Sequence, residues 1–114
     1  MTPPIKKLAV QISNTLVFIN PEEVIFATRK ARKSVIYTLQ GTYAINESLE
    51  KLEQRLDNEA FFRCHKGYLI NVAMVKEFSP WGRKTYLVKL LNTDETALIT
   101  LEKAKEFRRK YCIE

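Results

Sequence analysis

Short apolar stretches separated by turn-forming residues recur along the sequence, and this pattern limits the folds open to the chain. Within each stretch, β-branched and aromatic residues alternate with polar ones, which is the period of a strand buried on one face. Turn-forming pairs such as Ser13-Asn14 and Gln40-Gly41 stand between the stretches. Because strands joined by short turns pair antiparallel, the pattern predicts a mainly β domain.

The expected strands cover residues 8–12, 15–19, 24–29, 34–39, 42–45, 75–79, 84–91 and 96–100, and residues 61–71 supply further strand around a loop. A last helix is expected after Thr100, which can cap it. The predicted fold is therefore a set of short antiparallel sheets packed as an elongated β-sandwich-like domain, with one short central helix and a C-terminal helix.

The central helix is expected over residues 47–57, where the apolar period changes. Leu49, Leu52 and Leu56 recur at i, i+3 and i+7, and Asn46 or Ser48 can cap the helix N-terminus. We interpret the leucine stripe as a core face rather than as a partner-binding groove.

The stretch FFRCHKGYLIN, from Phe61 to Asn71, interrupts an apolar strand pattern with polar and basic groups. Arg63, His65 and Lys66 stand between β-prone residues, and Gly67 is expected to supply backbone freedom. The stretch predicts a sheet that presents a basic loop to a partner.

The charge balance points the same way. The 114 residues, expected to form one domain (1–114), carry 19 basic and 13 acidic side chains, a net charge of +6. The run RKARK at residues 29–33 adds a basic hairpin tip to the central loop. On charge alone, an acidic partner such as nucleic acid and a merely soluble basic surface both stay open.

Catalysis, metal binding and nucleotide binding find little support. Cys64 precedes His65, but neighbours on a strand point to opposite faces and cannot readily act as nucleophile and base. Together with Cys112 they give no metal-ligand spacing, and the 3 glycines form no phosphate loop. We expect no enzyme activity, no metal and no cofactor, and we interpret Cys64 as an inert packed thiol.

The segment MTPPIKK lacks the apolar core of a signal peptide, and the apolar runs fall short of the ~18 residues of a membrane span. Two cysteines without paired spacing fit a reducing compartment. These features predict a soluble, cytoplasmic protein without membrane contact.

Three kinds of partner are consistent with the basic loops. Double-stranded DNA offers phosphates and base edges to Lys and Arg. A protein partner could instead contact Trp81, Tyr68 and the leucine stripe, and a single-stranded nucleic acid could stack on strand tyrosines. Tyr37, Tyr68 and Tyr86 are more easily explained as half-buried strand residues.

The sequence resembles the LytTR-type DNA-binding domain of bacterial transcription regulators. The hallmark of that family is an aromatic residue, Arg, any residue, His, a basic or polar residue, a small residue, an aromatic, two aliphatics and Asn, which here is FFRCHKGYLIN. The resemblance extends through PEEVIFATR, SLEKLEQRL, VKEF and TALITLEKAKEF, roughly residues 8–110. It implies an all-β fold with little helix and a response regulator of a two-component system.

The resemblance also implies DNA contacts, with basic loops in successive major grooves of a promoter direct repeat. Lys66 corresponds to the position that reaches base edges from the central loop. Arg32 and Lys33 share base reading at the hairpin tip, and Arg29 and Lys30 are expected on phosphates.

Three further positions complete the implied site. Arg63 and His65 match the motif, and phosphate contact and internal hydrogen bonding are both open roles for them. Gly67 stands where the family usually has Ser, which removes one hydroxyl contact. The implied partners are double-stranded DNA, a second copy of the chain on the repeat, and an N-terminal receiver or sensory domain.

A third contact departs from the family pattern at the entry to the last helix. Thr100-Leu101 stands where the family commonly has Ser-Arg. Lys103 or Lys105, a turn or less further on, is expected to replace the missing arginine through a phosphate contact.

Overall fold

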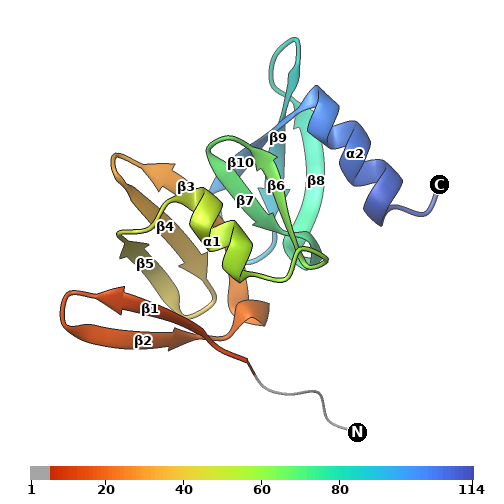
Figure 1. The fold of residues 1–114 in the computed structure, drawn as a ribbon. Coiled ribbons are helices and arrows are strands. Elements are labelled where there is room, and N and C mark those ends of the chain that lie inside the picture. The colour runs from red at the N-terminus through yellow and green to blue at the C-terminus, as the bar shows by residue number, and fades with distance from the viewer. Residues whose placement is uncertain (1–5) are drawn as a thin grey trace, which may run out of the picture.

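A five-stranded antiparallel sheet forms the centre of the structure, a computed structural model that describes residues 6–114 (Figure 1). Its strands lie in the order β5-β4-β3-β7-β6, so the β6–β7 hairpin pairs with β3 from an earlier part of the chain. The strands are β3 (Val24–Lys30), β4 (Lys33–Thr38), β5 (Gly41–Ile45), β6 (Phe61–His65) and β7 (Tyr68–Asn71).

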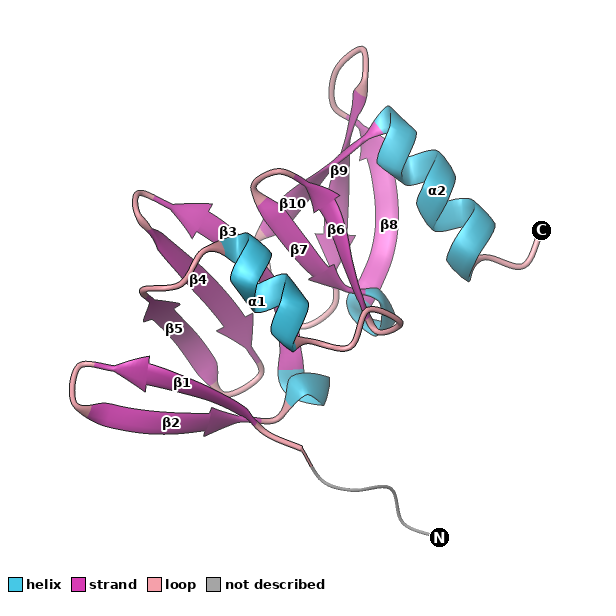
Figure 2. Cartoon of the chain, viewed as in Figure 1, coloured by secondary structure: helices cyan, strands magenta, loops and turns pink. Residues whose placement is uncertain are grey.

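Smaller elements cover both faces of the central sheet (Figure 2). A two-stranded hairpin and helix α1 pack on one face, and a three-stranded sheet in the order β10-β9-β8 packs with helix α2 on the other. These elements are β1 (Leu8–Ile12), β2 (Thr15–Ile19), α1 (Leu49–Arg55), β8 (Val75–Pro80), β9 (Thr85–Leu90), β10 (Thr96–Thr100) and α2 (Leu101–Tyr111).

Side chains of the β6–β7 hairpin alternate between two hydrophobic cores. Phe61 and Leu69 lie in the core beside α1 and the β1–β2 hairpin, whereas Phe62 and Ile70 lie in the core beside α2 and the three-stranded sheet. Full burial of a large apolar side chain contributes about 1.5–3 kcal/mol. Both faces of the hairpin therefore hold it in place, and a shift of one residue would exchange the two sets of side chains.

The predicted mainly β fold with two helices is confirmed. Ser48 caps α1, with its Oγ accepting from the Lys51 amide at 3.0 Å, and Thr100 caps α2, with its Oγ1 accepting from the Lys103 amide at 3.1 Å. Helix α1 is shorter than the expected 47–57 because the backbone of Leu56 is already extended.

The sequence pattern did not predict two short 3-10 helices, η1 (Pro21–Glu23) and η2 (Val72–Met74). The second lies where the chain leaves the central sheet for the three-stranded one, and Asn71 Oδ1 accepts from the Ala73 amide there. No helix within residues 6–114 is long and apolar enough to cross a membrane. Met1 to Ile5, which begin the N-terminal segment MTPPIKK, lie outside the described residues.

Candidate nucleic-acid interface

Three turns lie along one edge of the molecule, the upper edge in Figure 1: β3–β4, β6–β7 and β8–β9. The Arg29 amide donates to the Gly67 carbonyl oxygen at 3.1 Å, which ties the first two turns together. The Leu101 amide donates to the Lys84 carbonyl oxygen at 2.9 Å, which ties the third turn to the start of α2. The exposed cations of these turns and strand ends are Arg29, Lys30, Arg32, Lys33, Lys66, Arg83 and Lys84.

The β3–β4 turn consists of Ala31 and Arg32 alone, because the rest of the basic run belongs to the paired strands. Ala31 has a φ of 55°, the left-handed conformation common at the first position of two-residue hairpin turns. Lys30 and Lys33 consequently stand opposite each other across the hairpin. Like charges in that arrangement repel, so the pair destabilises the tip of the free protein.

A hydrogen-bonded chain leads from Lys30 to the loop before β10. Lys30 Nζ donates to Tyr37 Oη at 2.8 Å, and Tyr37 Oη donates to Glu95 Oε1 at 3.3 Å. The Tyr37 ring stacks on buried Phe26 with 4.5 Å between centroids, which fixes the phenol. The hydrogen bond to Tyr37 raises the pKa of Lys30, and the ammonium keeps further donors for a phosphate.

Hydrogen bonds fix the backbone of the β6–β7 turn. The Gly67 carbonyl oxygen accepts from Thr28 Oγ1 at 2.9 Å as well as from the Arg29 amide. The Gly67 amide donates to His65 Nδ1 at 3.1 Å, and the Lys66 carbonyl oxygen accepts from Arg63 Nη2 at 2.6 Å. The exposed Lys66 ammonium has no partner within residues 6–114, so the turn presents it on a rigid base.

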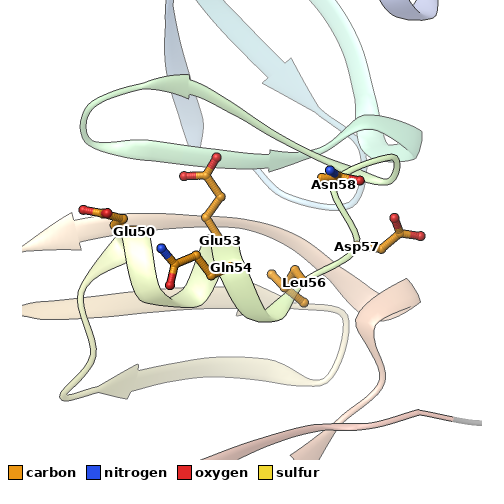
Figure 3. Close-up of a pocket in the computed structure, with 6 residues that line it drawn as sticks. All are labelled: Glu50, Glu53, Gln54, Leu56, Asp57 and Asn58. Atoms are coloured by element: carbon orange, nitrogen blue, oxygen red, sulfur yellow. The ribbon is translucent and has the colours of Figure 1, made fainter.

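Arg63 joins the turn to helix α1. Besides the bond to Lys66, its Nε donates to the His65 carbonyl oxygen at 3.0 Å and its Nη1 pairs with Glu53 Oε1 at 3.0 Å. Figure 3 shows Glu53 extending from α1 toward the hairpin. Of the two roles open for Arg63, internal hydrogen bonding is therefore present in the free protein.

His65 is half-buried, and its ring meets Tyr68 edge to face at 5.6 Å between centroids. Because Nδ1 accepts the Gly67 amide proton, that nitrogen is unprotonated and the neutral imidazole carries its proton on Nε2. Burial, followed by the nearby charges of Lys66 and Arg63, lowers the pKa of His65. The neutral ring is thus part of the turn's hydrogen bonding.

Cys64 occupies a bulge in β6, where the register shifts between Arg63 and His65. The thiol is fully buried and donates to the Leu98 carbonyl oxygen at 3.2 Å. Burial raises the pKa of Cys64 to about 12, so almost no thiolate forms near neutral pH. Cys64 is therefore an inert packed thiol in this fold. Its thiol bonds the Leu98 carbonyl oxygen, whereas the His65 ring bonds the Gly67 amide, so the two side chains do not act as a pair.

The entry to α2 offers less charge than expected. The Thr100 hydroxyl caps the helix, and Lys103 Nζ pairs with Glu106 Oε2 at 3.2 Å while lying 5.7 Å from the centre of the Phe62 ring. Lys105 is exposed and lies further along the same helix. Lys103 would have to share its ammonium between Glu106 and a phosphate.

A shallow groove lies on the α1 side of the molecule, and its character is acidic (Figure 3). Glu50 and Asp57 project from it into solvent, and Glu53 is the member engaged by Arg63. Its lining residues are Glu50, Glu53, Gln54, Leu56, Asp57 and Asn58. An acidic groove repels phosphate, so it is not a surface for nucleic acid.

The alternative partner surfaces differ in exposure. Leu49 and Leu52 are buried in the first core, which confirms the leucine stripe as a core face. Tyr37, Tyr68 and Tyr86 are half-buried against the second core and offer no open stacking platform. Trp81 differs from these tyrosines because its side chain is well exposed, at 63%.

Basic turns along one edge of a β scaffold are compatible with a nucleic-acid partner, and comparison with known proteins gives the family of the domain. The chain belongs to the LytTr DNA-binding domain family, whose model matches residues 14–111. The fold is that of the LytTr DNA-binding domain of a putative methyl-accepting/DNA response regulator from Bacillus cereus, with a TM-score of 0.76, 22% identity, and coverage of 90% of this chain and 94% of that one.

Curated relatives are longer than this chain. Transcriptional regulatory protein YpdB of Escherichia coli (strain K12) is 26% identical over 76% of this chain and 36% of its own length. Sensory transduction protein LytT of Bacillus anthracis is 29% identical over 75% of this chain and 35% of its own length. The chain therefore spans about a third of each of these relatives.

We predict that Gly67→Ala stabilises the protein. Contrary to the expectation of special backbone freedom, Gly67 does not adopt a left-handed φ, and an added Cβ would meet His65 Nδ1 at an ordinary 3.6 Å. Reduced freedom of the unfolded chain should add about 0.4–1 kcal/mol. Gly41→Ala is the control and should destabilise, because Gly41 has a φ of 144°. Urea unfolding measures both, and a destabilised Gly67→Ala would contradict the turn geometry.

We predict that stability falls as the pH drops below about 6.5, because the folded-state pKa of His65 lies under its ordinary value. The unfolded chain then binds the proton first, and the loss continues until the folded state also titrates. The chain has 1 histidine, so its imidazole resonance in NMR should give a midpoint below 6.5. His65→Gln should lack this pH step in urea unfolding; a midpoint at or above the ordinary value would refute the assignment.

Proposed function

We propose that the chain binds double-stranded DNA sequence-specifically and regulates transcription, with its basic turns in successive major grooves. The observation that carries the proposal is the single edge on which two linked turns present exposed cations. Cations on such turns can neutralise phosphates and reach the base edges of the major groove. The cations on the β3–β4 and β6–β7 turns are Arg29, Lys30, Arg32, Lys33 and Lys66.

The dimensions of the protein support contact with more than one groove. The described residues extend 43 × 42 × 24 Å. Equivalent points of one groove of B-DNA recur about every 34–36 Å along the axis. A domain of this extent is long enough to contact a duplex in more than one major groove.

Within this proposal, Lys66 reads base edges because its backbone is held while its ammonium is free. Arg32 and Lys33 share that task at the β3–β4 tip, and Arg29 and Lys30 contact phosphates. Sequence specificity then comes from the few side chains that contact bases, whereas the phosphate contacts add affinity for any duplex.

Other motif residues act through the turns. Arg63 and His65 hold the β6–β7 turn by their hydrogen bonds, and Gly67 supplies the carbonyl that joins it to β3. Thr100 caps α2, and Lys103 adds a phosphate contact when it releases Glu106. These residues hold the basic turns in position and contribute little to the recognition of the DNA sequence.

The wider setting is also part of the proposal. The relatives are named as a transcriptional regulatory protein and a sensory transduction protein, and this chain spans about a third of them. We infer a bacterial cytoplasmic regulator of the two-component type, in which residues 1–114 are one DNA-binding domain beside a receiver or sensory domain. A promoter direct repeat, with a second copy of the chain on it, is the expected target.

Binding to duplex DNA should weaken steeply with salt. If the edge engages ~5 phosphates, the slope of log affinity against log salt should be about −4 to −5. Fluorescence anisotropy with a duplex selected from a random pool, repeated at several salt concentrations, measures this slope. Competition with single strands of the same sequence is the control, and preference for the single strand or insensitivity to salt would refute duplex recognition.

Lys66→Ala and Lys30→Ala should fail in different ways. Loss of Lys66 should cost about 1–3 kcal/mol on the selected duplex and relax preference at one base pair, whereas loss of Lys30 should weaken selected and random duplexes alike. Lys89→Ala is the control, since this exposed lysine lies on β9 and outside the basic turns. Equal effects of the Lys66 and Lys30 variants on both duplexes would contradict the division of roles.

A further inference from the structure

We propose that the β8–β9 loop, residues 81–84, makes a third contact with the same duplex, with Arg83 and Lys84 on phosphates and the Trp81 ring against the sugar–phosphate backbone. The inference rests on the proposed function, because it adds a surface to the same DNA partner. The loop lies on the edge that carries the other basic turns (Figure 1).

Hydrogen bonds fix the place of this loop. The Trp81 amide donates to the Thr85 carbonyl oxygen at 3.2 Å, which closes the loop on itself. Thr85 pairs with Thr100 in the three-stranded sheet, and the Lys84 carbonyl oxygen accepts from the Leu101 amide at 2.9 Å. The base of the loop is therefore held against the junction of β10 and α2, where the entry to the helix itself offers little charge.

The loop supplies the positive charge that this junction lacks. Arg83 and Lys84 are both exposed, and neither has an acidic partner within residues 6–114. The first turn of α2 instead contains Glu102, and Lys103 is paired with Glu106. At this end of the edge, Arg83 and Lys84 are thus better placed than Lys103 to release counterions from a phosphate.

Trp81 gives the loop a second mode of contact. Its side chain is 63% exposed, although a tryptophan ring is large and mostly apolar. The flat ring can pack on a deoxyribose, and its Nε1–H can donate to a phosphate oxygen. An aromatic surface beside two cations fits a polyanion with apolar sugar faces better than it fits an acidic protein surface.

The test compares charge-matched double variants of the full chain on the selected duplex. Arg83→Ala/Lys84→Ala should reduce the magnitude of the salt slope by ~2, the loss of two phosphate contacts, and weaken binding at least tenfold at low salt. Lys76→Ala/Lys89→Ala removes the same charge at the opposite end of the three-stranded sheet and should change binding less than twofold. An equal loss in both variants, or no loss in the first, would overturn the inference.

Trp81 provides an independent readout, since the chain has 1 tryptophan. Its emission should shift to the blue and become protected from acrylamide when the duplex is added. An unchanged spectrum under saturating duplex would also overturn the inference. Circular dichroism of each variant confirms its folding.

The outcomes separate this inference from the function on which it rests. If the unmodified chain binds duplex and Lys66→Ala weakens it while the loop variant does not, only the third contact fails. If the unmodified chain does not bind duplex at all, both fail. The third contact is supported if the Arg83→Ala/Lys84→Ala variant loses duplex binding, the Lys76→Ala/Lys89→Ala control retains it, and the Trp81 emission changes on binding.

Discussion

Burial of both faces of the β6–β7 hairpin is the constraint on which the rest of the structure depends. Phe61 and Leu69 enter one core while Phe62 and Ile70 enter the other, so the hairpin is the layer that the two halves of the protein share. A one-residue slip would send each set of side chains into the opposite core, where neither set fits. The position of the turn at the end of this hairpin is consequently determined by the packing of the whole domain.

In the fold, most residues of the motif FFRCHKGYLIN support the structure of the hairpin, and one has a side chain without an internal partner. Six of its side chains are buried, and Asn71 among them bonds the Val24 carbonyl oxygen at 2.7 Å through Nδ2. Arg63 and His65 direct their donors and acceptor to the turn itself. Lys66 alone keeps an uncommitted charge, which is why the surrounding polar residues resemble a binding site and act largely as its support.

Much of the fold was predictable because the signals are local. Period-2 alternation marks the strands within a residue or two of their ends, and the caps Ser48 and Thr100 mark both helix starts. The pattern missed what depends on distant pairing. Nothing near Arg63 in sequence points to Glu53 on α1, and the contact of Lys84 with Leu101 arises only when β9 meets β10.

The site shows the same limit. A basic run indicates charge, but the two-residue turn at Ala31 decides that part of it lies on paired strands. Likewise, the freedom expected of Gly67 depended on a φ that sequence does not reveal. The resemblance to a family supplied the candidate residues, whereas their commitments to internal partners came from the three-dimensional contacts.

The opposed pair of Lys30 and Lys33 has a consequence for energetics. In the free protein the two like charges repel each other across the hairpin. A polyanion placed between the two ammonium groups turns that repulsion into attraction, so part of its affinity is repulsion released within the protein. The repulsion makes the β3–β4 turn open more readily in the free protein. Hydrogen exchange at the amides of this turn should therefore slow when an anion binds, even without a new contact to the backbone.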